Sequence, residues 1–256
     1  KQHDINDGKK AKLRNTLKKS IFEKSYQNEV LAELDKLDEV RGRVISKSIL
    51  LSEVLKGYTI IIQRLLDVEL DVASSTQIPT LGAKLRSYRI LEDAKESGGK
   101  LRANITGILA KDKEISSKKF STIISLKAGV NEGIVSSGLR LNERSMEYIS
   151  SFQNSDDWAT VNDIFESVLK KSDIGNYGYG PEEFFSGITR ALNILGELIT
   201  YEKEVIIALI IEIKDQAQSS LWRIFIMVGL TVVALSFFVS FTSNSIIKKI
   251  KTVISS

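Results

Sequence analysis

Arg102 and Arg190 share two features: no acidic residue lies one helical turn away, and small residues occupy the turn before each of them. In a helix, the surface neighbours of a residue are three and four positions away. For Arg102 these neighbours are Gly98, Gly99, Ile105 and Thr106; for Arg190 they are Ser186, Gly187, Asn193 and Ile194. Small neighbours leave room for a ligand or a close helix, and the planar fork of a guanidinium suits a planar oxyanion.

We therefore predict an anion-binding site that uses Arg102 and Arg190, with the hydroxyls of Thr106 and Thr189 nearby. The alternative is that each arginine meets a carboxylate on a neighbouring helix, or faces water. Other arginines have an acidic residue within one turn, a pattern typical of exposed ion pairs of small energetic value. They are Arg41, Arg43, Arg64, Arg89, Arg140 and Arg144.

The composition argues against catalysis. The chain has no cysteine, and its single histidine is His3. A thiolate, a zinc cluster or a serine–histidine–aspartate triad therefore cannot be assembled. The carboxylates alternate with lysines, as they do on solvated helix faces. We expect no enzyme, no metal and no cofactor.

Helical periodicity runs through the sequence, and no strand pattern is found. Apolar residues over Val30–Leu70 recur at spacings of three and four, which predicts one long helix. Ser74–Gly82 ends it, and the Gly98–Gly99 pair is expected to interrupt or kink the next helix. Further helices are predicted over 117–152, over 158–171 with Ser155 or Asp156 as N-cap, and over 182–241.

These elements predict an all-α fold. The stretch Lys171–Phe185 is the one real loop, because its three glycines and proline cannot continue a helix. Long helices need partners along their length to bury their apolar faces. We expect an elongated antiparallel helical bundle of two stacked four-helix modules, with a C-terminal transmembrane helix.

The segment Ile224–Phe241 has 18 residues and no charge, which is enough, with its flanks, to cross a bilayer as a helix. Trp222 precedes it, and three lysines follow it within residues 248–251. The positive-inside rule places those lysines in the cytoplasm. We predict an extracytoplasmic (periplasmic) sensor domain at 1–221, a span of the inner membrane at 222–244 and a cytoplasmic relay at 245–256. The continuous last helix could pass on a signal as a small displacement.

The first 24 residues hold eight lysines and arginines against three acidic residues. A nucleic-acid-binding arm is one interpretation of such a run. Because the predicted span places this end outside the cytoplasm, we instead expect a solvated helix face and no nucleic-acid partner.

Several short motifs follow the order seen in the NIT domain, the nitrate- and nitrite-sensing domain. They include "LKGYTIIIQRLL", "AKESGGKLRANI" and "FFSGITRALNIL". The resemblance implies an all-helical sensor of two bundles whose arginines bind nitrate or nitrite, and Arg102 matches a motif position. Family members carry a glutamate-arginine-glycine motif in their first helix, which this sequence lacks. We expect that helix to precede Lys1. Ser243–Ser256 resembles the opening of a HAMP domain, the relay module behind the membrane in bacterial receptors.

The sequence is compatible with three functions. The first is a sensor that binds a small anion and signals through the membrane helix to a HAMP relay, as a homodimer by analogy with membrane-relay receptors of chemotaxis. The second is a four-helix-bundle chemoreceptor sensor for organic acids or amino acids, with Tyr58 or Trp158 as apolar wall. The third is a structural bundle without a ligand.

Overall fold

The computed structural model of the chain describes residues 8, 11–16, 18, 24–46 and 48–254. Within these ranges every regular element is a helix, which confirms the predicted all-α class. The chain divides into a first unit, Lys1–Glu204, and a second unit, Val205–Ser256.

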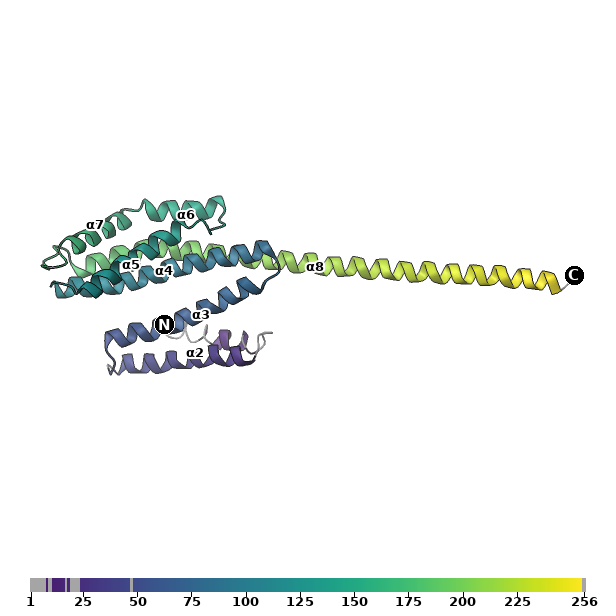
Figure 1. The fold of residues 1–256 in the computed structure, drawn as a ribbon, viewed down its shortest axis with the longest axis horizontal. Helices are drawn as coiled ribbons and strands as arrows, with labels where there is room; N and C mark the ends of the chain where they lie inside the picture. Colours follow the sequence, from purple (N-terminus) through teal and green to yellow (C-terminus); the bar gives the residue numbers. More distant parts are fainter. Residues whose placement is uncertain (1–7, 9–10, 17, 19–23, 47, 255–256) are drawn as a thin grey trace. The chain divides into compact units, whose positions relative to one another are not determined.

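Two helices, α2 (Lys24–Ile45) and α3 (Leu51–Ser75), replace the single helix predicted over Val30–Leu70, which is therefore wrong. The chain turns between residues 46 and 50 (Figure 1). At this turn the Ser46 hydroxyl donates to the Gly42 carbonyl at 3.0 Å, and such side-chain bonds compete with helix continuation. Helices α2 and α3 pack against each other.

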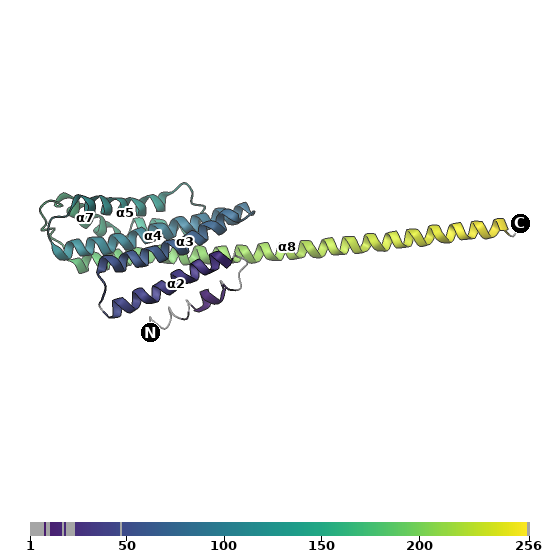
Figure 2. The same cartoon turned by 60° about the horizontal axis from the view of Figure 1, so that its bottom comes forward.

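The main core of the first unit joins α4 (Pro79–Lys111), α5 (Ser117–Val135), α6 (Glu143–Gln153), α7 (Asp156–Lys170) and the start of α8 (Pro181–Ile254). Each helix contributes buried side chains to one cluster, among them Leu101, Ile123, Phe152, Ile164 and Leu195. Helices α4 and α5 lie side by side (Figure 2). Helices α6 and α7 follow one another (Figure 1) and together take the place of one helix in a four-helix module. A second stacked module stays a prediction.

Local polar signals set the helix ends within this module. The helix predicted over 117–152 is wrong, because α5 ends at Val135 and α6 begins at Glu143. Asn142 caps α6 by accepting a hydrogen bond from the Ser145 amide at 2.9 Å. Ser155 caps α7 in the same way, accepting from the Trp158 amide at 3.1 Å, as the sequence predicts.

The glycine-rich loop before α8 is fixed to the end of α4. Gly175 has a φ of 80°, and a Cβ at this position would lie 2.7 Å from the Asp112 carbonyl oxygen. The Asp112 carboxylate accepts a hydrogen bond from the Tyr177 amide at 2.9 Å. Glycine is needed here for both its backbone angle and the close approach, and α8 then begins at Pro181.

Helix α8 runs without a break from Pro181 to Ile254, as predicted up to Phe241. Its side chains are described as far as Thr231. In the part of the chain so described, no helix combines the length and the apolar character that crossing a membrane requires. The predicted span at 222–244 falls mostly beyond Thr231 and stays a prediction, as does the relay at 245–256.

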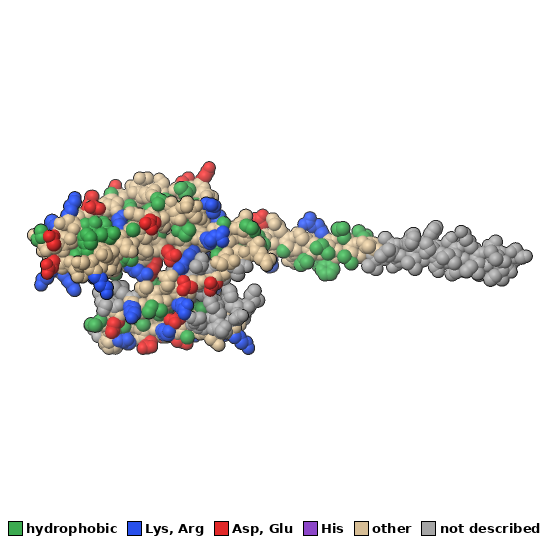
Figure 3. Space-filling view, in the orientation of Figure 1, with side chains coloured by type: hydrophobic (Ala, Val, Ile, Leu, Met, Phe, Trp, Pro, Cys, Tyr) green, Lys and Arg blue, Asp and Glu red, His purple; other side chains and the backbone are tan. Residues whose placement is uncertain are grey.

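Charged side chains of both signs are interspersed on the face of the first unit seen in Figure 3. Four of the eight basic residues at 1–24 are described, namely Lys12, Arg14, Lys18 and Lys24. Arg14 forms an ion pair with Asp35 of α2.

Candidate functional site

Arg102 lies on α4, and its side chain reaches α8. Its Nη1 donates a hydrogen bond to Thr189 Oγ1 at 3.0 Å, and the Thr189 hydroxyl donates in turn to the Phe185 carbonyl at 2.5 Å. The guanidinium carbon is 5.0 Å from the centre of the Phe185 ring, within cation–π range. Among the described residues, Arg102 forms no ion pair with a carboxylate. Its guanidinium is therefore oriented without being neutralised.

Thr106 follows Arg102 by one turn on the same face of α4. Its Oγ1 is buried and has no hydrogen-bond partner within the described part of the chain. A buried hydroxyl without a partner is costly, so this position favours a further polar group. We call Arg102, Thr106, Phe185 and Thr189 the Arg102 cluster.

The two glycines before Arg102 have different surroundings. A Cβ on Gly98 would lie 2.4 Å from Cδ2 of Leu192, a buried residue of α8, whereas a Cβ on Gly99 would meet nothing within 4 Å. Gly98 thus lets α4 and α8 approach closely, and Gly99 leaves open space one turn before Arg102. The expected interruption of the helix is wrong: α4 is continuous through both glycines, because tight packing at Gly98 compensates for its low helix propensity.

The same substitution at the two glycines is expected to have opposite consequences. Gly99→Ala should raise the free energy of unfolding by about 0.5–1 kcal/mol, because alanine is the better helix former and nothing obstructs its methyl group. The Gly98→Ala variant should have a free energy of unfolding about 1–2 kcal/mol lower than that of the Gly99→Ala variant, because its methyl group overlaps Leu192. Urea unfolding followed by circular dichroism measures both; equal stabilities would show that Gly98 is not a packing constraint.

Arg190 does not share the environment of Arg102. Its Nε and Nη2 donate to the Asp157 carboxylate of α7 at 3.0 Å and 2.6 Å, and this pairing raises the pKa of Arg190. The side chain is 61% exposed. The alternative stated above, a carboxylate on a neighbouring helix, therefore holds for Arg190, and its guanidinium is not brought into the Arg102 cluster.

Lys127 is a buried cation that the sequence analysis missed. It lies on α5 with its Nζ 3.9 Å from the centre of the Trp158 ring of α7, and it donates to Asn131 Oδ1 at 3.3 Å. Burial lowers the pKa of Lys127 to about 8, and the nearby Glu166 carboxylate counters part of this shift. One signal for its burial was available: Lys127 falls in an apolar stripe with Ile123, Val130 and Ile134.

The lowered pKa of Lys127 predicts a stability change at alkaline pH. Between about pH 8 and 10.5 the unfolded chain keeps the Lys127 proton that the folded chain has lost, so the free energy of unfolding rises with pH. Relative to Lys127→Met, the protein should gain roughly 2–3 kcal/mol between pH 8 and 10. Urea unfolding at several pH values measures the difference.

A spectroscopic control accompanies this prediction. In a Trp222→Phe background, which leaves Trp158 as the one remaining tryptophan, the fluorescence should titrate with a midpoint near pH 8. Lys127→Met should remove that transition. A fluorescence midpoint near 10, or one that persists in Lys127→Met, would contradict the assignment.

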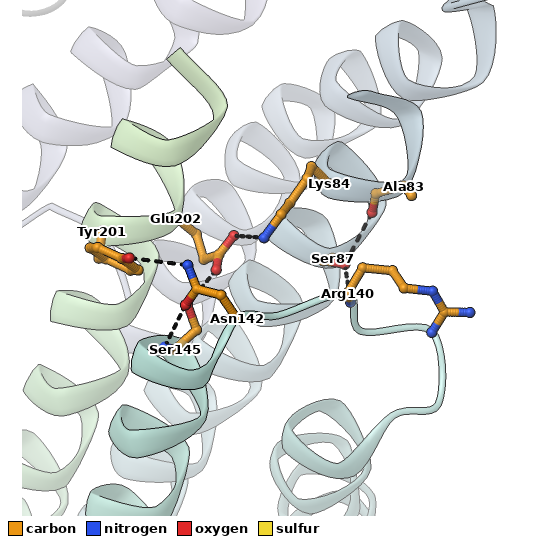
Figure 4. A network of polar contacts seen from close by, with 8 residues as sticks. All are labelled: Ala83, Lys84, Ser87, Arg140, Asn142, Ser145, Tyr201 and Glu202. Carbon is orange, nitrogen blue, oxygen red and sulfur yellow. Dashed lines mark hydrogen bonds and ion pairs between the residues drawn. The ribbon is translucent and has the colours of Figure 1, made fainter. Parts of the chain in front are cut away.

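A second buried charge, Glu202 of α8, anchors a polar network that joins three helices (Figure 4). Glu202 is fully buried; one carboxylate oxygen accepts from the Ser145 hydroxyl of α6 at 2.5 Å. The other lies 3.2 Å from the Lys84 ammonium of α4. Beside it, Asn142 Nδ2 donates to the Tyr201 hydroxyl at 3.1 Å.

The described residues contain no group of histidine, cysteine, aspartate and glutamate side chains that could hold a metal ion. The Arg102 cluster instead offers hydrogen-bond donors and positive charge, which fits an anion. Thr189 and Phe185 contact Arg102 directly, and the roles of Thr106 and Thr189 as ligands stay predictions.

A family model described as nitrate and nitrite sensing matches residues 2–201 of the chain. The match covers most of the first unit, including α4 and the start of α8, and it agrees with the sequence resemblance to the NIT domain. The family is one of sensing domains, which suggests a non-enzymatic role. No curated protein and no solved structure matches the chain.

Proposed function

The chain belongs to the nitrate- and nitrite-sensing family, and we propose that it senses a small planar oxyanion, nitrate or nitrite, at the Arg102 cluster. The observation that supports this site most strongly is the Arg102 guanidinium, which is oriented by Thr189 and Phe185 and unpaired with any described carboxylate. The unpartnered Thr106 hydroxyl adds a donor one turn away. Arginine presents a planar fork of donors that matches a planar oxyanion.

The proposal extends to transmission through α8. Phe185 and Thr189 lie near the start of this helix, which continues to Ile254. An anion that takes hydrogen bonds from Arg102 competes with the Thr189 hydroxyl, and the contact between α4 and α8 changes. We infer that a small displacement of α8 carries the signal.

Isothermal titration calorimetry tests the binding step. Nitrate or nitrite should give a saturable heat with one site per chain, while sulfate, a tetrahedral dianion, should bind at least about tenfold more weakly because it fits a planar site poorly. Citrate and succinate test the organic-acid alternative. No heat with any of these anions would overturn the proposal and favour a bundle without a ligand.

We also infer membrane attachment through residues 222–244, supported by the uncharged run Ile224–Phe241 in the sequence. The first unit would then be extracytoplasmic, and 245–256 would open a cytoplasmic relay of the HAMP type in a dimeric receptor. Deletion of 222–244 should move the protein from the membrane fraction of lysed cells to the supernatant. An unchanged distribution would contradict the predicted span.

A further inference from the structure

A groove between α6 and α8 is separate from the Arg102 cluster and shares no residue with it. Its volume is about 590 Å³, and its lining includes Arg144, Tyr148, Glu197, Tyr201 and Glu204. It therefore combines both charge signs with two aromatic rings on one open surface.

The aromatic side of this groove is held in place by the Glu202 network. The Tyr201 hydroxyl accepts a hydrogen bond from Asn142 Nδ2 at 3.1 Å, and Asn142 is itself fixed as the cap of α6. The Tyr148 and Tyr201 rings lie 6.2 Å apart, and the Arg144 guanidinium lies 4.9 Å from the Tyr201 ring. A ligand would meet walls that are already ordered, which lowers the entropy cost of binding.

The charged side chains of the groove lack ion-pair partners within the described part of the chain. The sequence predicts an Arg144–Glu147 ion pair, but no ion pair involves Arg144, Glu197 or Glu204 among the described residues. The two glutamates are seven positions apart on α8, which is two turns along one face. Arg144 faces them from α6.

We propose that this groove binds a small zwitterion with an ammonium group, a carboxylate and an aromatic side chain, that is, an aromatic amino acid. Arg144 pairs with the carboxylate, Glu197 or Glu204 accepts the ammonium, and the ligand ring stacks on Tyr148 and Tyr201. A ligand with one charge alone leaves an opposite charge in the groove without a partner.

Three related compounds test this proposal by calorimetry on the full chain. L-Phenylalanine carries both charges, phenethylamine lacks the carboxylate, and 3-phenylpropionate lacks the ammonium. We expect L-phenylalanine to bind at least about tenfold more tightly than either analogue, since each loses one charge-assisted contact.

Substitutions of the charged residues assign the contacts. Arg144→Gln should abolish the preference for L-phenylalanine over phenethylamine, and Glu197→Gln combined with Glu204→Gln should abolish its preference over 3-phenylpropionate. Lys203→Gln is the matched control, because Lys203 is exposed on the same helix but does not line the groove. Arg102→Gln should leave L-phenylalanine binding unchanged, so failure of the proposed oxyanion site and failure of this groove are distinguishable.

Two results would overturn the proposal. One is the absence of L-phenylalanine binding at about 10 mM ligand, with circular dichroism showing a folded chain. The other is equal affinity for the three compounds, which would indicate that the rings alone attract an aromatic molecule.

Discussion

Replacing Arg102 with glutamine is expected to weaken nitrate binding by about hundredfold. Glutamine ends two bonds short of the Arg102 Nη1 atom that donates to Thr189, and it has neither the charge nor the donor fork of the guanidinium. Two charge-assisted hydrogen bonds to one anion are worth roughly 3 kcal/mol together, which corresponds to about a hundredfold in affinity. Calorimetry on the folded variant measures the loss, and circular dichroism checks that helicity is retained.

The matched control is Arg190→Gln, because Arg190 lies next to Thr189 on α8 but is committed to Asp157. We expect its nitrate affinity to stay within about twofold of the unmodified chain, since an exposed ion pair contributes little. Equal losses in the two variants would show that the Arg190–Asp157 pair opens to admit the anion. An unchanged affinity in Arg102→Gln would sink the Arg102 assignment outright.

Two further substitutions separate charge from geometry in the same site. Arg102→Lys keeps the charge but loses the planar fork, so an intermediate loss of about tenfold is expected. Thr106→Val removes the unpartnered hydroxyl at constant volume. It should weaken nitrate binding and leave stability unchanged or improved, because the buried donor no longer lacks a partner. Stronger nitrate binding in Thr106→Val would exclude Thr106 as a ligand.

Local chemistry explains which parts of the fold the sequence could predict. Ser155, Pro181 and the glycines of the last loop act on their immediate backbone, so the starts of α7 and α8 were predictable. The turns at 46–50 and 136–142 were missed because side-chain hydrogen bonds mark them, from Ser46 at the end of α2 and to Asn142 at the start of α6. The apolar periodicity continues across both turns, and on its own it therefore predicts one unbroken helix at each place.

In the candidate site, too, the sequence predicts only contacts between residues that are close along the chain. Comparing positions one turn apart identified Arg102 and Arg190 as lacking local acids, and for Arg102 no carboxylate partner is found in the described part of the chain. For Arg190 the partner is Asp157, 33 positions away, and only the packing of α7 against α8 brings it close. Helix periodicity carries no information about such pairs.

The sequence pattern was sufficient to predict the two buried charges, Lys127 and Glu202, but the sequence analysis did not predict them. On α8 the residues Leu195, Leu198 and Ile199 are buried, and Glu202 occupies the next position of the same stripe. A carboxylate at a core position predicts a partner, because burying an isolated charge is prohibitively costly. Lys127 shows the same signal on α5.

Replacing Lys84 with methionine is expected to lower the free energy of unfolding by about 3 kcal/mol. Glu202 has no exposed surface, and Lys84 supplies the one cation paired with it among the described residues. Removing one partner of a buried pair leaves a charge without compensation, which typically costs 3–5 kcal/mol. We take the lower end because the Lys84 side chain is 19% exposed. Urea unfolding at neutral pH measures the change.

A double replacement separates the cost of an orphaned charge from the value of the pair itself. Lys84→Met combined with Glu202→Leu should recover most of the loss, because a buried ion pair is often no more stabilising than apolar side chains of similar size. Arg43→Met is the control: its pair with Glu53 is 44% and 52% exposed, so a change below about 1 kcal/mol is expected. The charge pair joins α4 to α8, whereas the hydrogen bond from Ser145 to Glu202 joins α6 to α8. If the double variant were as unstable as Lys84→Met, the loss of that hydrogen bond would cost as much as the removal of the orphaned charge recovers. The aromatic wall of the groove would then depend on that bond, because Asn142, the cap of α6, also fixes Tyr201.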